Sequence, residues 1–166
     1  MATHRLAFAD TLVPDTSGSV FWQPASILDT NDTFPTTSVL IYTDTAVHDK
    51  AFGRFFVPKN YVGSANIIVR YKTTVTSGNT LWTAGYTSIA PGETGDPAAV
   101  QEALGGSATA VPGTTNLLKD ITIALTAANL AVDDTVLVYV GRNGAGADTA
   151  AASLQLVDVF FEYADV

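Results

Sequence analysis

The stretch FFVPKNYVGSANIIVRYKTTVTSGNTLWTAGYTSIA, residues Phe55–Ala90, predicts two long β-strands that meet at a turn. Its first half carries apolar side chains at alternate positions, namely Ile67, Val69, Tyr71 and Val75. Its second half repeats the pattern with Trp82, Ala84 and Tyr86. Alternation with a period of two is typical of strands that bury one face. Because Ser77-Gly78-Asn79 between the halves has the composition of a turn, we expect a β-hairpin here.

Further segments with strand character lie on both sides of this stretch, at the spacing of a β-sandwich. They are SVLIYT, AFGRFFV, TTNLLKDITIAL, TVLVYVGRN and ASLQLVDVFFEYA. The one long interruption contains Asp96-Pro97 and Gly105-Gly106, which are helix start and stop signals, so we expect one short helix there. The strands are long and this largest connection falls mid-chain. The sequence therefore predicts an all-β fold, a single jelly-roll-like β-sandwich of about eight antiparallel strands.

Residues 1–35 differ from the remainder, because Pro, Asp and Thr interrupt them and only two short apolar islands, RLAFA and SVFWQ, occur. We interpret them as an N-terminal extended arm with one or two short strands, and residues 36–166 as the β-sandwich domain. Two placements of the arm are open: against a neighbouring subunit, or along the chain's own sheet.

The charge of the chain argues against nucleic acid as a partner. Its 166 residues include 8 Lys and Arg against 16 Asp and Glu, a net charge of −8, and the bases do not cluster as phosphate contacts require. No apolar run approaches the length of a membrane span, and the first residues lack the apolar core of a secretion signal. We expect a soluble protein without a membrane partner. Only 14% of residues are charged, which favours a surface partly covered in an assembly.

The sequence offers little for catalysis. His4 and His48 lie far apart and neither belongs to a nucleophile motif, while Asp133 and Asp134 are adjacent in a turn rather than placed to converge across a cleft. We predict that the protein is not an enzyme and needs no cofactor.

One segment resembles the beginning of a calcium-binding loop. Asp29, Asn31 and Asp32 have the alternate spacing of such a loop, but its Gly and its distant Glu are missing. We therefore favour a turn rich in Asp and Asn, and leave open a weak Ca²⁺ site near Asp29 and Asp32.

Three aromatic residues allow two interpretations. Tyr71, Trp82 and Tyr86 would form a platform for stacking sugar rings if they faced solvent, or the centre of the core if they faced the second sheet. Their alternation with Thr83 and Thr87 favours the core.

Two long segments resemble β-sandwich virion proteins of tailed bacteriophages and their prophage relatives. These segments are VLIYTDTAVHDKAFGRFFVPKNYVGSANIIVRYKTTVTSGNTLWTAGYTSIAPGE and AVDDTVLVYVGRNGAGADTAAASLQLVDVFFEY. The residues that carry the resemblance are Asp44-Thr45, Pro58, Tyr61, Gly63, Thr76-Ser77-Gly78, Trp82, Arg142 and Asp148. The resemblance covers about Val39 to Tyr163, includes no catalytic signature, and does not extend to the arm.

The resemblance implies a phage virion structural protein. Our first hypothesis is a capsid decoration, or cement, protein on the outer capsid surface, made in the host cytoplasm. It would bind the major capsid protein and its own copies as a homotrimer, with these arm residues as contacts: Arg5, Leu6, Phe8, Phe21 and Trp22. The alternative is a receptor- or carbohydrate-binding head of a tail fibre or spike, with a glycan platform of Tyr71, Trp82 and Tyr86.

Overall fold

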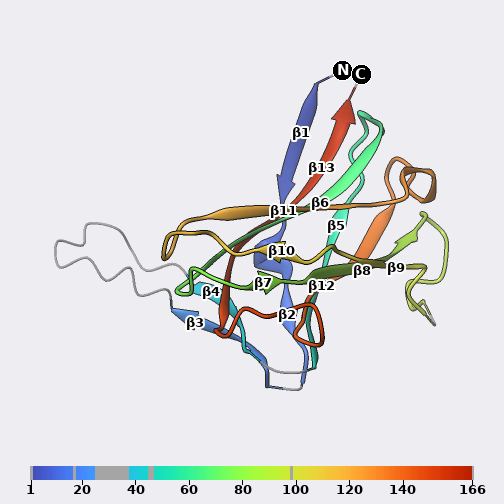
Figure 1. Cartoon of the computed structure of the whole chain (residues 1–166). Coiled ribbons are helices and arrows are strands. Elements are labelled where there is room, and N and C mark those ends of the chain that lie inside the picture. Colours follow the sequence, from blue (N-terminus) through green and yellow to red (C-terminus); the bar gives the residue numbers. More distant parts are fainter. Residues whose placement is uncertain (1, 17, 25–37, 45–46, 98, 166) are drawn as a thin grey trace.

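The computed structural model describes residues 2–16, 18–24, 38–44, 47–97 and 99–165. They form two large antiparallel sheets that enclose one core (Figure 1). The first sheet has the order β11 (Lys119–Ala124), β6 (Tyr61–Thr73), β13 (Leu154–Asp165), β4 (Ser38–Tyr42) and β3 (Val20–Pro24), with β1 (Thr3–Ala7) also paired to β13. The second has the order β2 (Val13–Pro14), β5 (His48–Phe56), β12 (Thr135–Asn143), β8 (Trp82–Ile89) and β9 (Glu102–Gly105).

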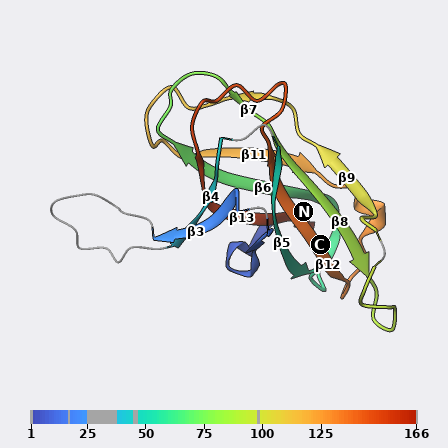
Figure 2. The ribbon, with the colours of Figure 1, turned by 90° about the horizontal axis from the view of Figure 1, so that it is seen from below.

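The smaller elements lie at the ends of these sheets. β7 (Asn79–Thr80) and β10 (Thr109–Ala110) form a two-stranded ribbon, and two single 3₁₀ turns are η1 (Ala9–Thr11) and η2 (Ala127–Asn129). Figure 2 shows the two large sheets from below, with β12 beside β5 and β8.

Eight of the strands have the connectivity of a jelly roll. The order β4-β13-β6-β11 in one sheet faces β5-β12-β8-β9 in the other, so the chain crosses between sheets at almost every connection. All recorded strand pairs are antiparallel. The predicted all-β jelly-roll sandwich of about eight strands is therefore confirmed.

The predicted hairpin of Phe55–Ala90 is wrong, although both of its strands exist. β6 pairs with β11 and β13, whereas β8 pairs with β12 and β9 in the opposite sheet. The connection crosses between sheets and passes so close to the loop after β12 that a Cβ on Gly78 would lie 2.5 Å from the carbonyl oxygen of Thr149. A period of two reports which face a strand buries but does not identify its partner strand.

The predicted short helix between Pro97 and Gly105 is replaced by an edge strand. Glu102–Gly105 forms β9, and the described residues just before it are turns and bends. Backbone hydrogen bonds to β8 hold this segment, from Gln101 N to the carbonyl of Tyr86 and from Gly106 N to the carbonyl of Trp82, both 3.0 Å. Pairing with a neighbouring strand outweighs the helix start and stop signals here.

The described part of residues 1–35 lies on the chain's own sheets, the second of the two placements left open by the sequence. β1 pairs with β13, β2 with β5 and β3 with β4. Phe8 is 4% exposed, and its ring packs 5.1 Å from that of Phe55. These residues are therefore integral strands of the sandwich and do not form a free arm.

A buried arginine fixes the loop between β12 and β13. Arg142 is fully buried and forms a two-point ion pair with Asp148, at 2.9 Å from Nε and 2.8 Å from Nη2. It also donates to the carbonyls of Ala150 and Ala152, each at 2.7 Å. Because Asp148 is 1% exposed at its side chain, each charge compensates the other away from water.

We expect Arg142→Met to lower the free energy of unfolding by about 3–5 kcal/mol, because Asp148 would remain as an uncompensated buried carboxylate. Urea denaturation measures this change. Arg54→Met is the matched control, since Arg54 is exposed and the same charge is removed. Equal loss in both variants would contradict the structural role of the buried pair.

Candidate functional site

The three aromatic residues proposed as a glycan platform lie in the core. Tyr71, Trp82 and Tyr86 are 0%, 1% and 1% exposed. The rings of Tyr71 and Trp82 are 5.5 Å apart across the two sheets, and the Tyr86 hydroxyl donates to Glu102 at 2.6 Å. The structure thus brings them together, but on the inner faces of the sandwich, where no saccharide can stack on them. The core interpretation of their alternation is the correct one.

The residues proposed as arm contacts have divided environments. Phe8 is in the core, and Arg5 is engaged with Glu162 at 2.8 Å. Phe8 is therefore not available as an anchor in a neighbouring subunit, whereas the Arg5 side chain is 43% exposed and its contact stays an untested prediction. Leu6 is 38% exposed, and Phe21 and Trp22 are each 41% exposed, so a contact through them stays an untested prediction.

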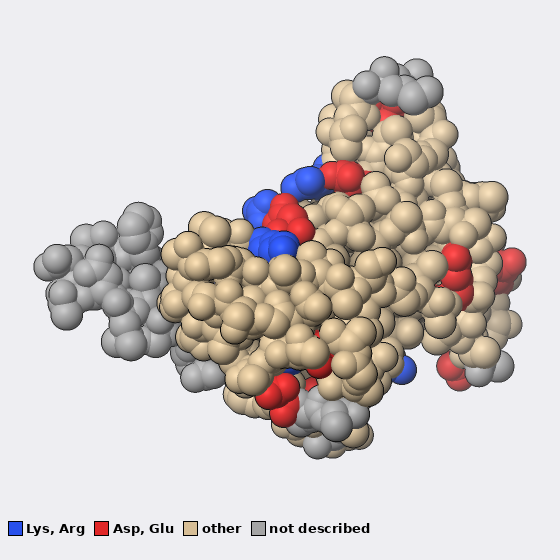
Figure 3. All heavy atoms as spheres, in the orientation of Figure 1, with Lys and Arg blue, Asp and Glu red and all other residues tan. Residues whose placement is uncertain are grey.

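The surface around Arg5 is an ion-pair network. Arg70 pairs with Asp120 at 2.8 Å, and Arg5 approaches the same carboxylate at 3.5 Å. These interactions hold the pKa of Asp120 below its usual value, with the Arg70 hydrogen bonds as the largest cause. Figure 3 shows acidic and basic side chains adjoining on this face, while most of the visible surface is uncharged. Mutual pairing makes this cluster a structural feature of the first sheet.

The remaining sequence candidates do not form a reactive site. Asp29, Asn31 and Asp32 lie outside the described residues. Asp134 is buried and accepts a hydrogen bond from the Ser88 hydroxyl at 2.6 Å. Within the described ranges, no group of three or more His, Cys, Asp or Glu side chains has a metal-binding arrangement, and no helix there is long and apolar enough to cross a membrane.

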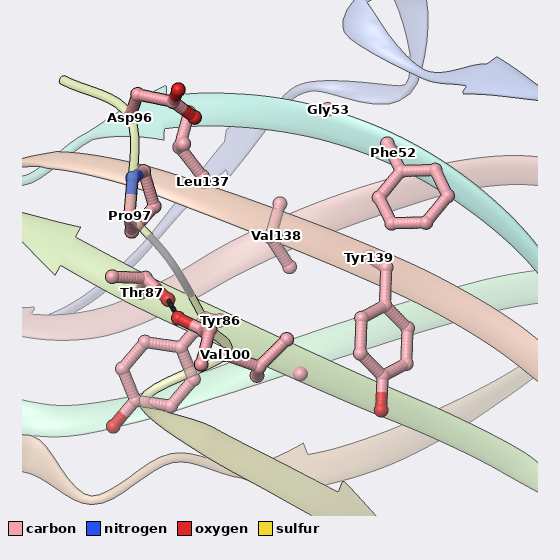
Figure 4. Close-up of a pocket in the computed structure, with 12 residues that line it drawn as sticks. Phe52, Gly53, Tyr86, Thr87, Asp96, Pro97, Val100, Leu137, Val138 and Tyr139 are labelled. Carbon is pink, nitrogen blue, oxygen red and sulfur yellow. Dashed lines mark hydrogen bonds between the residues drawn. The ribbon is translucent and has the colours of Figure 1, made fainter.

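A cleft of about 380 Å³ lies on the outer face of the second sheet (Figure 4). Strand register aligns Phe52 on β5, Tyr139 on β12 and Gly85 on β8 in one row across the sheet. The loop before β9 forms the opposite wall with Pro97 and Val100. Phe52 and Val100 are each 48% exposed, so the cleft presents apolar surface to solvent.

Glycine in β8 makes room for the aromatic ring that lies at the base of the cleft. A Cβ on Gly85 would lie 2.7 Å from Cζ of Tyr139, so only glycine allows the ring to lie across β8. The ring also meets Phe52 edge to face, with centroids 6.2 Å apart. Burial raises the pKa of Tyr139, so its hydroxyl remains protonated at neutral pH. Tyr139 is 7% exposed, and therefore supports Phe52 more than it offers a face of its own.

Polar groups continue the same face beyond Tyr139. The Nζ of Lys50 lies 4.6 Å from the centre of the Tyr139 ring, a cation–π contact. His48 lies over Gly141 and places Nε2 at 2.6 Å from the Thr83 hydroxyl oxygen. That hydroxyl donates to the Gly141 carbonyl at 3.3 Å, which leaves its oxygen to accept from the imidazole. Burial, with a smaller contribution from Lys50, lowers the pKa of His48.

The arrangement suits binding more than catalysis. An exposed aromatic ring beside hydrogen-bonding groups fits a ligand that has one apolar face and a polar rim. Asp96 is the one carboxylate among the residues that line the cleft. Those residues therefore supply no pair of carboxylates for acid–base chemistry.

Sequence reasoning missed Phe52 and Tyr139. A signal for Phe52 was present, because Lys50 and Arg54 are two residues away on either side and share its face of the strand. Two cations on one face indicate that the face meets solvent, which makes a Phe between them an exposed aromatic. Tyr139 gave no such signal, because it lies in the nearly continuous apolar run TVLVYV.

No protein-family model matches the sequence, and no curated protein matches it. Solved structures do match the fold. The native structure of a family 35 carbohydrate-binding module from Clostridium thermocellum has 12% identity and a TM-score of 0.54, over 97% of this chain and 98% of that one. The CBM36-1 domain of a multidomain xylanase from the hindgut metagenome of Trinervitermes trinervoides has 10% identity and a TM-score of 0.48, over 99% and 100%. At these identities the family 35 module shares the β-sandwich fold, which by itself assigns no ligand.

We expect Gly85→Ala to reduce stability by about 1–3 kcal/mol, because the new methyl group would displace the Tyr139 ring. Thermal unfolding measures the loss, and near-ultraviolet circular dichroism measures the altered tyrosine environment. Gly105→Ala on the neighbouring strand is the control, since its Cβ would meet open space. If the two variants have the same stability and spectrum, Tyr139 does not lie over Gly85.

We expect stability to decrease as pH falls below about 6.5, the pKa of histidine in an unfolded chain. In the folded state the pKa of His48 is lowered. Between this lowered pKa and the unfolded pKa, the unfolded state therefore binds the proton more readily than the folded state does. Urea denaturation from about pH 7.5 to about pH 5.5 tests this. His48→Gln should flatten the dependence in this window, and an unchanged slope would show that His48 is not its source.

Proposed function

We propose that the protein is a non-catalytic carbohydrate-binding domain whose binding face is the outer surface of the second sheet. The observation that carries this proposal is Phe52, which is 48% exposed at the edge of a 380 Å³ cleft. A pyranose ring has an apolar face of C–H groups and a rim of hydroxyls. An aromatic ring buries that apolar face, while neighbouring polar side chains contact the rim.

The cleft has three parts that serve this role. Phe52 supplies the stacking surface, and Val100 on the opposite wall adds apolar contact. The Tyr139 hydroxyl supplies a donor, since no hydrogen bond from the described residues occupies it. Asp96 lies on the loop that borders the cleft and can accept from sugar hydroxyls. The jelly-roll fold shared with a carbohydrate-binding module supports the proposal but does not carry it.

The biological setting is a separate proposal. A carbohydrate- or receptor-binding head of a phage tail fibre or spike would use this face directly. Capsid decoration, with the major capsid protein as partner, a homotrimeric state and a place on the virion, rests on the sequence resemblance and on the low fraction of charged residues. The binding face proposed on the second sheet favours the tail setting over the capsid one.

Phe52→Ala should weaken saccharide binding about tenfold. The substitution removes the ring, and about half of the ring surface is exposed and able to contact the sugar. A glycan array identifies a bound saccharide, and isothermal titration calorimetry then compares the variants with the unchanged protein.

Phe56→Ala is the matched control for this substitution. Phe56 is on the same strand and the same face, is 59% exposed, and does not line the cleft. We expect its affinity to equal that of the unchanged protein. Equal losses in both variants would place the ligand elsewhere on this face, and binding unaffected by Phe52→Ala would reject the proposed site.

A further inference from the structure

Two cations flank the stacking residue on the binding face. Lys50 and Arg54 precede and follow Phe52 by two positions on β5, so all three side chains leave the same face of the strand. Side chains two positions apart on a strand are separated by about 7 Å. A sugar stacked on Phe52 therefore lies within reach of both cations.

Lys50 and Arg54 differ from the three other arginines of the chain in having no carboxylate partner among the described residues. Arg5, Arg70 and Arg142 each contact a carboxylate at 2.8 Å. Neither Lys50 nor Arg54 forms an ion pair with any residue that the structure describes. The chain contains 16 Asp and Glu against 8 Lys and Arg, so carboxylates are abundant. Cations without an acidic partner beside a cleft leave their charge available to a ligand.

Lys50 is positioned before any ligand arrives. Its Nζ lies 4.6 Å from the centre of the Tyr139 ring, and Gly85 gives that ring its place across β8. The contact is a cation–π interaction, which leaves the ammonium protons free to donate. A lysine side chain that is already held in place loses less conformational entropy when a ligand binds. The affinity for an anion at this position is therefore higher.

The negative groups do not cancel this arrangement. Asp96 is the carboxylate that lines the cleft, and Figure 4 shows it beside Pro97 and Leu137, away from Phe52 and Tyr139. Register places Arg54 in the row of Leu137, toward Asp96, so Lys50 occupies the opposite and positive end. The net charge of −8 acts mostly from a distance and is screened beyond about 8 Å at physiological salt, so it opposes a close contact with Lys50 only weakly.

We propose that the saccharide bound at this cleft is acidic, and that a carboxylate or sulfate on it contacts Lys50 while a sugar ring stacks on Phe52. This inference rests on the proposed carbohydrate-binding function and specifies the class of saccharide. The lysine ammonium is a compact charge whose N–H groups can donate to a carboxylate or to a sulfate. Both anions would therefore be recognised by the same charge-assisted hydrogen bonds.

Paired saccharides test this inference with the full chain. The probes are oligogalacturonates and their methyl esters, in which esterification removes the charge and adds a methyl group. The second pair is sulfated and desulfated keratan oligosaccharides, which carry no carboxylate, and neutral xylo- and manno-oligosaccharides are added. Calorimetry should give at least tenfold higher affinity for the acidic member of the pair that binds. That difference should decrease as sodium chloride is raised, because an exposed ionic contact is screened.

Variants locate the contact. Lys50→Met should lower affinity for the acidic saccharide about tenfold more than it lowers affinity for the neutral partner. Lys59→Met removes the same charge from an exposed position outside the cleft and should change neither value. Thermal unfolding of both variants shows whether loss of the Tyr139 contact has altered the fold, and Lys50→Arg, which keeps the charge, should retain the preference.

The outcomes separate the two proposals. Equal affinity for acidic and neutral partners, or a preference that survives Lys50→Met, overturns the acidic-saccharide inference while the carbohydrate-binding function stands. Preference for the acidic member in the carboxylated pair alone, or in the sulfated pair alone, supports the inference and identifies the anion. If no saccharide of the panel or of a glycan array binds the unchanged protein, the carbohydrate-binding function itself is rejected.

Discussion

Hydrogen bonding of β12 to β5 on one side and β8 on the other is the constraint on which the second sheet depends. The pairing runs along nearly all of the strand, from Thr135 opposite Phe56 to Asn143 opposite His48. A slip of one residue would turn every β12 side chain to the opposite face. This register places Val136, Val138 and Val140 in the core and gives Arg142 its buried partner. The same register aligns Phe52, Tyr139 and Gly85 on the outer face, so the core and the cleft are specified together.

The outer face of the second sheet exposes apolar side chains to water, which is energetically unfavourable. A jelly-roll sheet exposed to water ordinarily alternates apolar and polar side chains, but β12 is apolar at five of its first six positions. Leu137 and Tyr139 are covered in part by the loop before β9 and by Lys50, while Phe52 keeps almost half of its surface in water. An exposed apolar patch with a polar margin is typical of a binding surface. A purely structural account explains the buried Tyr139 and the edge of Phe52 that packs on it, but not the half of Phe52 that stays in water.

Much of the fold could be predicted from residue alternation, and the errors have specific physical causes. Alternation located the strands and the inward faces of Tyr71 and Trp82. It paired these strands wrongly, because sequence period contains no information about which sheet a strand joins. A register shift between Leu156 and Asp158 in β13 turns Val157 toward solvent, at 36% exposed, whereas strict alternation along the strand would place it on the inner face with Phe161. Bulges of this kind leave no reliable local signal.

The cleft was less predictable than the fold because it depends on tertiary contacts. Its depth comes from a loop held over β8, where the Thr87 hydroxyl donates to Ala99 and accepts from Gln101. Neither the loop position nor the open space beside Gly85 follows from residue types alone. The charges beside Phe52 are visible in the sequence and are a signal, overlooked in the sequence analysis, that its face is exposed. Only the structure shows that Tyr139 lies beneath Lys50.

The polar groups that are already engaged limit how this face can recognise a ligand. The hydroxyl of Thr87 uses its donor and its acceptor within the loop contact, and that of Thr83 does so between Gly141 and His48. A ligand that sought hydrogen bonds from these hydroxyls would have to break existing ones, with little net gain. Among the described residues of this face, the Tyr139 hydroxyl and the charged ends of Lys50, Arg54 and Asp96 remain available. Under the proposed function, discrimination among saccharides on this face comes largely from charge, and the stacking ring supplies affinity that is tolerant of sugar identity.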